Sequence, residues 1–108
     1  MAAITNEDWT VAAGAASVAS GISVTSPPRL SQVVDAVRDT GGQGVAVYEA
    51  SIIAWQKRLA ASEGIFGEAT SAVAFAGLER LIADGVIASD DRVVVPVTGS
   101  GLKEPLPE

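Results

Sequence analysis

A helix of small apolar residues followed by a run of valines most constrains what this chain can fold into. The helix is predicted over Thr70–Asp84 with Gly85 ending it, and its stretch Ala72–Leu78 is apolar almost all the way round. Such a helix is typical of burial against a sheet. The run Arg92–Val97 is nearly continuous in β-branched residues, as in strands covered on both faces. We therefore expect an α/β fold, a three-layer fragment of a parallel sheet.

Two further helices and a second strand are predicted upstream. An amphipathic helix is indicated by apolar residues at helical spacing followed by two glycines: Leu30, Val33, Val34 and Val37, then Gly41 and Gly42. Another helix is expected near Ala50–Glu63, with Gln56 on its polar face and Gly64 as its stop. The alternating run Gly44–Tyr48 is predicted to be a strand. One right-handed crossover unit follows, which makes two strands and three helices in all.

Composition shifts along the chain predict its domain organisation. Residues 1–26 are rich in alanine, serine and glycine and are expected to form a partly ordered leader. Pro27 and Pro28 cannot continue a helix from upstream, so a boundary is predicted there. Residues 27–105 are then the α/β portion. The acidic stretch Glu104–Glu108 is interpreted as a solvated end, with residues 106–108 as the tail.

The absence of cysteine and histidine excludes several classes of chemistry. Disulfides, thiolate metal sites and serine–histidine or cysteine–histidine catalysis all need residues that this sequence lacks. A net charge of −6 with scattered basic residues argues against nucleic acid and anionic membrane surfaces as partners. No apolar run approaches the roughly 20 residues of a membrane span. Without a secretory signal pattern, we expect a cytoplasmic protein.

The motif TGSGLK, Thr98–Lys103, comes directly after the valine run. Open α/β sheets bind ligands at the carboxyl edge of their strands, so this position favours a binding role. Taken alone, however, the motif fits a turn that closes the domain better than a ligand site. The other glycine-rich stretch, Gly41–Gly44, follows a helix and enters a strand. A phosphate-binding loop has the reverse order, so no ligand site is assigned there.

The order of four segments resembles one enzyme family: EGIFGEATSA at Glu63–Ala72, the small-residue helix, the valine run and TGSGLK. Together they resemble the C-terminal part of threonine synthase and its relatives, the β-family or fold type II enzymes that depend on pyridoxal phosphate. The resemblance covers roughly Ser17–Pro105. The chain departs from the family at Glu68–Ala69, where the family usually has Glu-Pro, and at Gly67, where it has a bulkier residue.

Site residues are implied by this resemblance. Thr98 would face the pyridine nitrogen of the cofactor, and Gly99 and Gly101 would shape the turn. A neutral hydroxyl at that nitrogen does not keep it protonated, which moderates the electron sink. Glu68 and Ser71, by contrast, are interpreted as helix-start residues rather than ligands.

The resemblance also implies a reaction, the conversion of O-phosphohomoserine to threonine with release of phosphate. Neither Lys57 nor Lys103 suits the role of the cofactor lysine, and no phosphate-binding cup is found in the sequence. We expect an enzyme piece that is inactive alone. Its partners would be a complementing N-terminal catalytic part, or further copies of itself, and a small amino-acid substrate.

Two other classes of protein remain open at this stage. The chain could be a non-catalytic remnant or subunit that pairs with a partner through its sheet edge, because two strands without neighbours leave ladder groups uncovered. It could also be an unrelated small α/β binding domain. A neighbouring chain carrying the lysine and phosphate cup would favour the enzyme piece.

Overall fold

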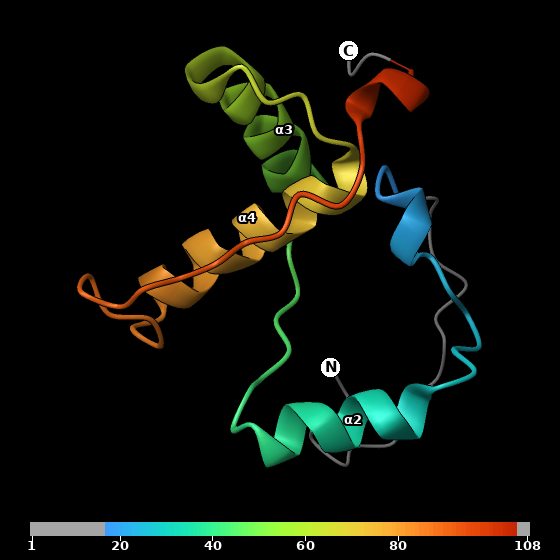
Figure 1. Ribbon diagram of the computed structural model, residues 1–108, viewed down its shortest axis with the longest axis vertical. Coiled ribbons are helices and arrows are strands. Elements are labelled where there is room, and N and C mark those ends of the chain that lie inside the picture. The colour runs from blue at the N-terminus through green and yellow to red at the C-terminus, as the bar shows by residue number, and fades with distance from the viewer. Residues whose placement is uncertain (1–16, 106–108) are drawn as a thin grey trace. The chain divides into compact units, whose positions relative to one another are not determined.

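The computed structural model describes residues 17–105, which form two separate units (Figure 1). Residues 24–46 make one unit and contain helix α2, Leu30–Asp39. The second unit consists of residues 17–23 and 47–105. Its elements are two helices and two 3-10 turns: η1 (Ser20–Ile22), α3 (Glu49–Glu63), α4 (Ala69–Ala83) and η2 (Gly101–Lys103). Residues 1–16 of the predicted leader and the predicted tail at 106–108 lie outside the described residues, and the predicted domain boundaries stay predictions.

All three helices lie where the sequence predicts them, to within about one residue at each end. Gly64 caps α3 with φ of 68°, and Gly85 follows α4 with φ of 72°. These left-handed conformations suit glycine, which has no Cβ to clash, and they stop each helix. After α4, the N–H groups of Gly85 and Val86 donate to carbonyls of the last turn, so the helix end is satisfied.

The second unit is built on the packing of α3 against α4. Ile52 of α3 and small residues of α4 form its buried core together with Ala19, which has no exposed surface. Small side chains let the two helices approach closely. At the edge of this contact the Trp55 ring stacks on Phe75 with centroids 5.8 Å apart, and its indole N–H donates to Glu79 at 2.9 Å. Ala19 thereby attaches the segment of residues 17–23 to this core.

Gln56 corrects the predicted polar face of α3. Its side chain is buried, with 4% exposed, and its amide donates to the carbonyl oxygen of Gly67 at 2.9 Å. A buried carbonyl in the connection between the helices needs a donor, because an unpaired one is costly. Gln56 supplies it, and thereby fixes the chain just before α4.

The predicted three-layer parallel sheet is wrong. Within residues 17–105 there is no strand, and both Gly44–Tyr48 and Arg92–Val97 are irregular. The pairing found is a single antiparallel bridge between Gly67 and Ser100. Valine favours extended backbone, but a strand also needs a neighbour to complete its ladder, and neither run has one among the residues that the structure describes. Three of the valines expected to be covered are exposed, Val93, Val94 and Val97, with Val94 exposed by 91%.

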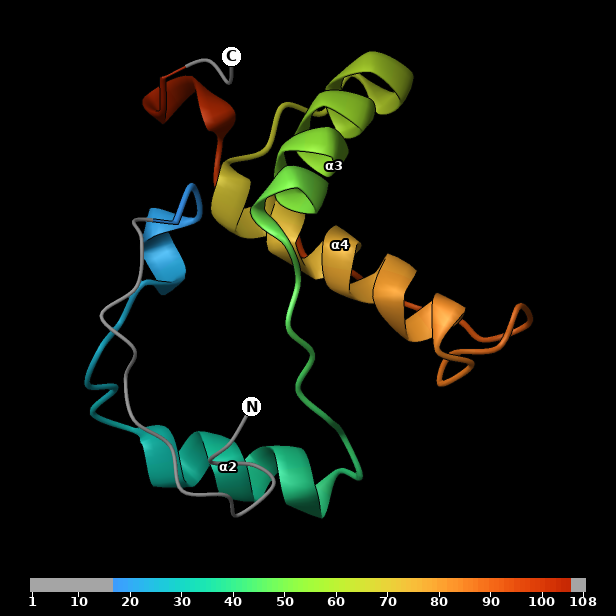
Figure 2. The ribbon, with the colours of Figure 1, turned by 180° about the vertical axis from the view of Figure 1, so that it is seen from behind.

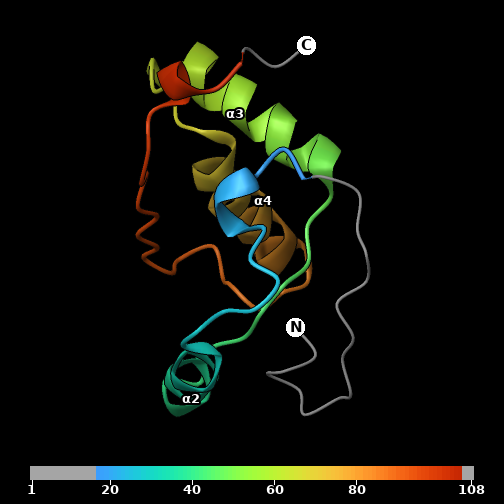
Figure 3. The ribbon, with the colours of Figure 1, turned by 90° about the vertical axis from the view of Figure 1, so that its right-hand side faces the viewer.

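The chain after α4 returns to the beginning of the same helix. Figures 1 and 2 show residues 88–98 running back past α4 toward its N-terminus, where η2 follows. In Figure 3, η1 lies against α4, and the Gly21 N–H donates to the Thr70 hydroxyl oxygen at 3.2 Å. Three distant parts of the sequence therefore meet at the first turn of α4. In the described part of the chain, no helix is long and apolar enough to cross a bilayer.

Candidate functional site

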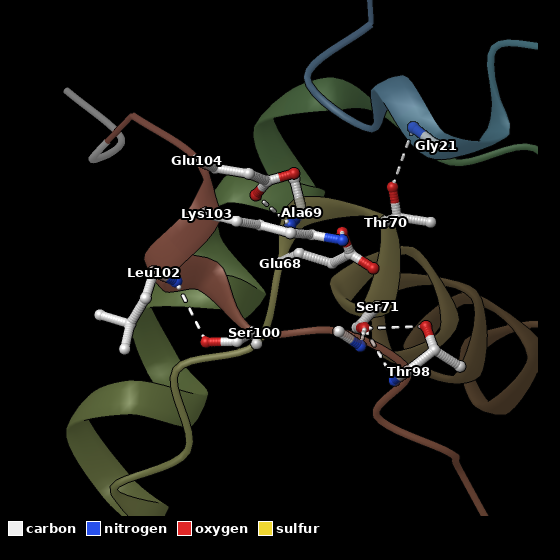
Figure 4. Close-up of polar contacts among 12 residues, drawn as sticks. Gly21, Glu68, Ala69, Thr70, Ser71, Thr98, Ser100, Leu102, Lys103 and Glu104 are labelled. Carbon is white, nitrogen blue, oxygen red and sulfur yellow. Dashed lines mark hydrogen bonds and ion pairs between the residues drawn. The ribbon is translucent and has the colours of Figure 1, made fainter.

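The TGSGLK turn is attached to the residues that lead into α4. The Glu68 N–H donates to the carbonyl of Gly99 at 3.0 Å, and the Gly101 N–H donates to the carbonyl of Phe66 at 2.9 Å. Ser100 caps η2 by accepting from the Leu102 N–H at 3.2 Å. These bonds hold the turn against the start of α4, in the arrangement that Figure 4 shows.

Ser71, in the first turn of α4, connects the TGSGLK turn to the helix through its hydroxyl. Its hydroxyl oxygen lies 3.0 Å from the backbone nitrogen of Thr98, 3.2 Å from that of Gly99 and 3.1 Å from the Thr98 hydroxyl oxygen (Figure 4). Ser71 is buried, with 3% exposed, whereas Thr98 is exposed. One buried hydroxyl therefore positions an exposed residue that carries a hydroxyl of its own.

Both glycines of the turn lie in close contact with residues that precede α4. A Cβ at Gly99 would fall on the carboxylate of Glu68. At Gly101 it would lie 2.7 Å from a ring carbon of Phe66 and 2.8 Å from the Gly67 carbonyl oxygen. Both approaches are closer than Cβ atoms normally allow, so these positions suit glycine for steric reasons rather than for a special φ.

Charged side chains gather at the same end of α4. Glu68 is the residue before the helix, its side chain is 12% exposed, and a carboxylate oxygen lies 2.7 Å from the Lys103 ammonium. This hydrogen bond and the negative charge raise the pKa of Lys103. Glu104 accepts a hydrogen bond from the Ala69 N–H at 2.8 Å. Carboxylates are favourable at the positive end of a helix dipole.

Chemically, this cluster offers a neutral hydroxyl donor or acceptor beside two carboxylates and one ammonium. Because the helix N-terminus is already occupied by the Glu104 carboxylate, it is poorly suited to holding a phosphate as well. Thr98 is an exposed residue, and its hydroxyl is suited to a polar atom of a neutral ring.

Thr98, Gly99 and Gly101, the predicted site residues, all lie in this one turn, and their contact with a cofactor stays a prediction. Sequence reasoning assigned Ser71 only to the helix start and did not foresee its bonds to the turn. Glu104 was expected to be solvated, and its bond to the helix start corrects that expectation. No local pattern signals either contact, because each joins residues 27 or more positions apart.

Comparison with known proteins places the chain among enzymes of one cofactor class. The model of a family described as "pyridoxal-phosphate dependent enzyme" matches residues 2–99. Threonine synthases from Methanocaldococcus jannaschii and Methanosarcina acetivorans are each 41% identical over 88 residues, which is 82% of this chain and 22% of each relative. The Mycobacterium tuberculosis threonine synthase is 38% identical over 82% of this chain and 24% of its own length. The chain thus spans about a quarter of the length of these relatives.

Proposed function

We propose that this chain, which belongs to the family of pyridoxal-phosphate dependent enzymes, is the C-terminal part of a threonine synthase-like lyase. The enzyme would convert O-phosphohomoserine to threonine and phosphate. The similarity to three threonine synthases over 82% of the chain supports this assignment. The observation that carries it to a site is the exposed residue Thr98, held in a turn by the buried Ser71.

In this proposal, Thr98 meets the pyridine nitrogen of the cofactor. Pyridoxal phosphate, when bound, supplies the electron sink for the reaction. A hydroxyl can donate to an unprotonated ring nitrogen and carries no charge that would hold a proton there. Gly99 and Gly101 let the turn sit close to Glu68 and Phe66, which keeps Thr98 in place. The cofactor phosphate would be held elsewhere, because the start of α4 already carries carboxylates.

We further propose that the chain is inactive by itself and works with a complementing catalytic part. An amine that is to attack a carbonyl needs a lowered pKa in a desolvated pocket. Lys103 has the opposite setting, since Glu68 raises its pKa and its side chain is 62% exposed. Lys57 is exposed on α3. Neither therefore suits the role of cofactor lysine.

A chimera tests the role of Thr98. In it, this chain replaces the segment that it matches in the threonine synthase of Methanocaldococcus jannaschii. Thr98→Val keeps the shape and removes the hydroxyl, whereas Thr98→Ser is the matched control that keeps it. Losing a hydrogen bond worth about 0.5 to 1.5 kcal/mol should lower turnover roughly 3-fold to over 10-fold in the valine variant alone. Equal turnover with valine and threonine would overturn the assignment.

The second candidate function is a non-catalytic subunit that binds a partner chain. Its support is the exposed apolar surface of the run after α4, at Val93, Val94 and Val97, which are 45%, 91% and 40% exposed. Surface of this kind favours association. A chimera that binds cofactor and turns over argues for the enzyme piece. An inactive chimera, together with a chain that binds another protein tightly through these valines, argues for the subunit.

A further inference from the structure

The hydroxyl of Ser71 has its hydrogen-bonding capacity fully assigned by its neighbours. A serine hydroxyl carries one hydrogen and two acceptor lone pairs. The N–H groups of Thr98 and Gly99 donate to it at 3.0 and 3.2 Å and occupy both lone pairs. What remains is the hydrogen of Ser71 itself, and the Thr98 hydroxyl oxygen lies 3.1 Å away.

Burial decides which of the two hydroxyls donates in this contact. If Thr98 donated, Ser71 would have to accept three bonds, and its own hydrogen would be left unpaired in a residue that is only 3% exposed. Thr98 is exposed, so its hydrogen can find an acceptor outside the fold. In the favoured arrangement, therefore, the Ser71 hydroxyl donates to the Thr98 hydroxyl oxygen, and the Thr98 hydroxyl donates to an acceptor outside the fold.

We propose that Ser71 is a positioning residue that holds the Thr98 hydroxyl as an outward hydrogen-bond donor, matched to an acceptor such as an unprotonated aromatic ring nitrogen. This inference rests on the proposed function of Thr98. Accepting a hydrogen bond from Ser71 polarises the Thr98 hydroxyl and strengthens its own donation, because hydrogen bonds in a chain reinforce one another. Ser71 acts only through Thr98 and touches no ligand itself.

The first experiment uses this chain alone and measures amide hydrogen exchange. Ser71→Ala should speed exchange at the Thr98 and Gly99 amides about 2-fold to 10-fold, since both lose their acceptor. Ser62→Ala is the control, because that hydroxyl donates to the Arg58 carbonyl on an exposed surface. If Ser71→Ala does not fold, Ser71→Cys, of similar size and with a weaker thiol, replaces it. Unchanged exchange at both amides would overturn the inference.

The second experiment uses the chimera loaded with cofactor labelled with ¹⁵N in the ring. The ring-nitrogen chemical shift, which reports hydrogen bonding and protonation, is compared for Ser71→Ala, Thr98→Val and the double variant. Both single variants should move the shift in the same direction and lower turnover about 3-fold to 10-fold. The double variant should match Thr98→Val, because Ser71 works through Thr98.

Failure of this inference is distinguishable from failure of the proposed function. If Thr98→Val moves the shift and Ser71→Ala leaves it unchanged, the role of Thr98 stands and the positioning role of Ser71 is wrong. Additive effects of the two changes would likewise show that Ser71 does not act through Thr98. If neither variant moves the shift, the proposed function and the inference both fall.

Discussion

Replacing Gly101 by alanine tests the close junction between η2 and the chain before α4. The new Cβ would lie 2.7 Å from a Phe66 ring carbon and 2.8 Å from the Gly67 carbonyl oxygen. That carbonyl cannot easily move, because it accepts the Gln56 amide at 2.9 Å in the interior. Gly101 is not among the glycines with positive φ, so the penalty is steric rather than conformational.

The expected loss of stability follows from two destabilising contributions and one that opposes them. Forcing extra volume into a close-fitting site costs about 1–3 kcal/mol. Displacing Gly101 also weakens the bond from its N–H to the Phe66 carbonyl, which contributes about 0.5–1.5 kcal/mol. Alanine restricts the unfolded chain and returns roughly 0.4–1 kcal/mol. We expect the free energy of unfolding to fall by about 0.5–4 kcal/mol.

Urea unfolding followed by circular dichroism measures this loss. With a slope of about 1 kcal/mol per molar urea, the midpoint should drop by about 0.5–4 M. Gly42→Ala is the control, since the closest atom to its Cβ is the Val37 carbonyl oxygen at 3.3 Å, a milder approach than those at Gly101, and it should lower the stability less. Gly99→Ala should lie between them, because the flexible Glu68 carboxylate can swing aside. A Gly101→Ala chain as stable as the Gly42→Ala control would refute the reasoning.

Three further predictions concern charge and association. Glu68 raises the pKa of Lys103, so their ion pair stabilises the fold below pH about 10.5, and this stabilisation is lost as pH rises through the higher pKa of the folded state. The difference in unfolding free energy between the unaltered chain and Lys103→Met should therefore shrink from pH 8 to pH 11.5. A constant difference would contradict the pairing. Glu104→Ala should cost about 0.3–1 kcal/mol in urea unfolding by removing the carboxylate that accepts from Ala69, and Glu104→Gln, which keeps an acceptor, should cost less. Because Val94 is 91% exposed, the chain should associate at high concentration, and Val94→Asp should lower the mass measured by light scattering; a sharp monomer for the unaltered chain would exclude this.

The helices were predictable because their signals are local. Apolar spacing identified α2, and the glycines that stop α3 and α4 lie at the end of each pattern, so their positions needed no knowledge of the rest of the fold. The face of α3 was only partly predictable. Gln56 has a polar side chain that is typical of a solvated position, but a carbonyl 11 residues later draws it into the interior.

The predicted strands failed because a strand depends on a partner. The Arg92–Val97 run has the composition of a covered strand, yet Val93, Val94 and Val97 are exposed and no residue of the described chain pairs with the run. Composition reports a preference for extended backbone and carries no information about which segment completes the ladder. The predicted sheet therefore depended on neighbouring strands, which the described residues do not supply.

The candidate site was likewise predictable only in part. The glycines and threonine of TGSGLK predicted a turn, and the resemblance to a known family, rather than the motif alone, marked it as a site. The residues that hold the turn were not identified, since Ser71 lies 27 positions before Thr98 and Glu104 lies 35 positions after Ala69. Partners at such separations are set by the packing of α3 on α4.

The convergence of distant segments on the first turn of α4 has a consequence for the order of folding. Gly21, Thr98 and Glu104 all bond to residues 69–71, and the sequence separations are 49, 27 and 35. Each bond closes a long loop, whose entropy must be lost before the contact contributes. The α3–α4 hairpin closes a much shorter loop, so we expect it to form early and the turn that carries Thr98 to be locked last. During synthesis, the bond from the Ala69 N–H to Glu104 can form only after Glu104 has left the ribosome.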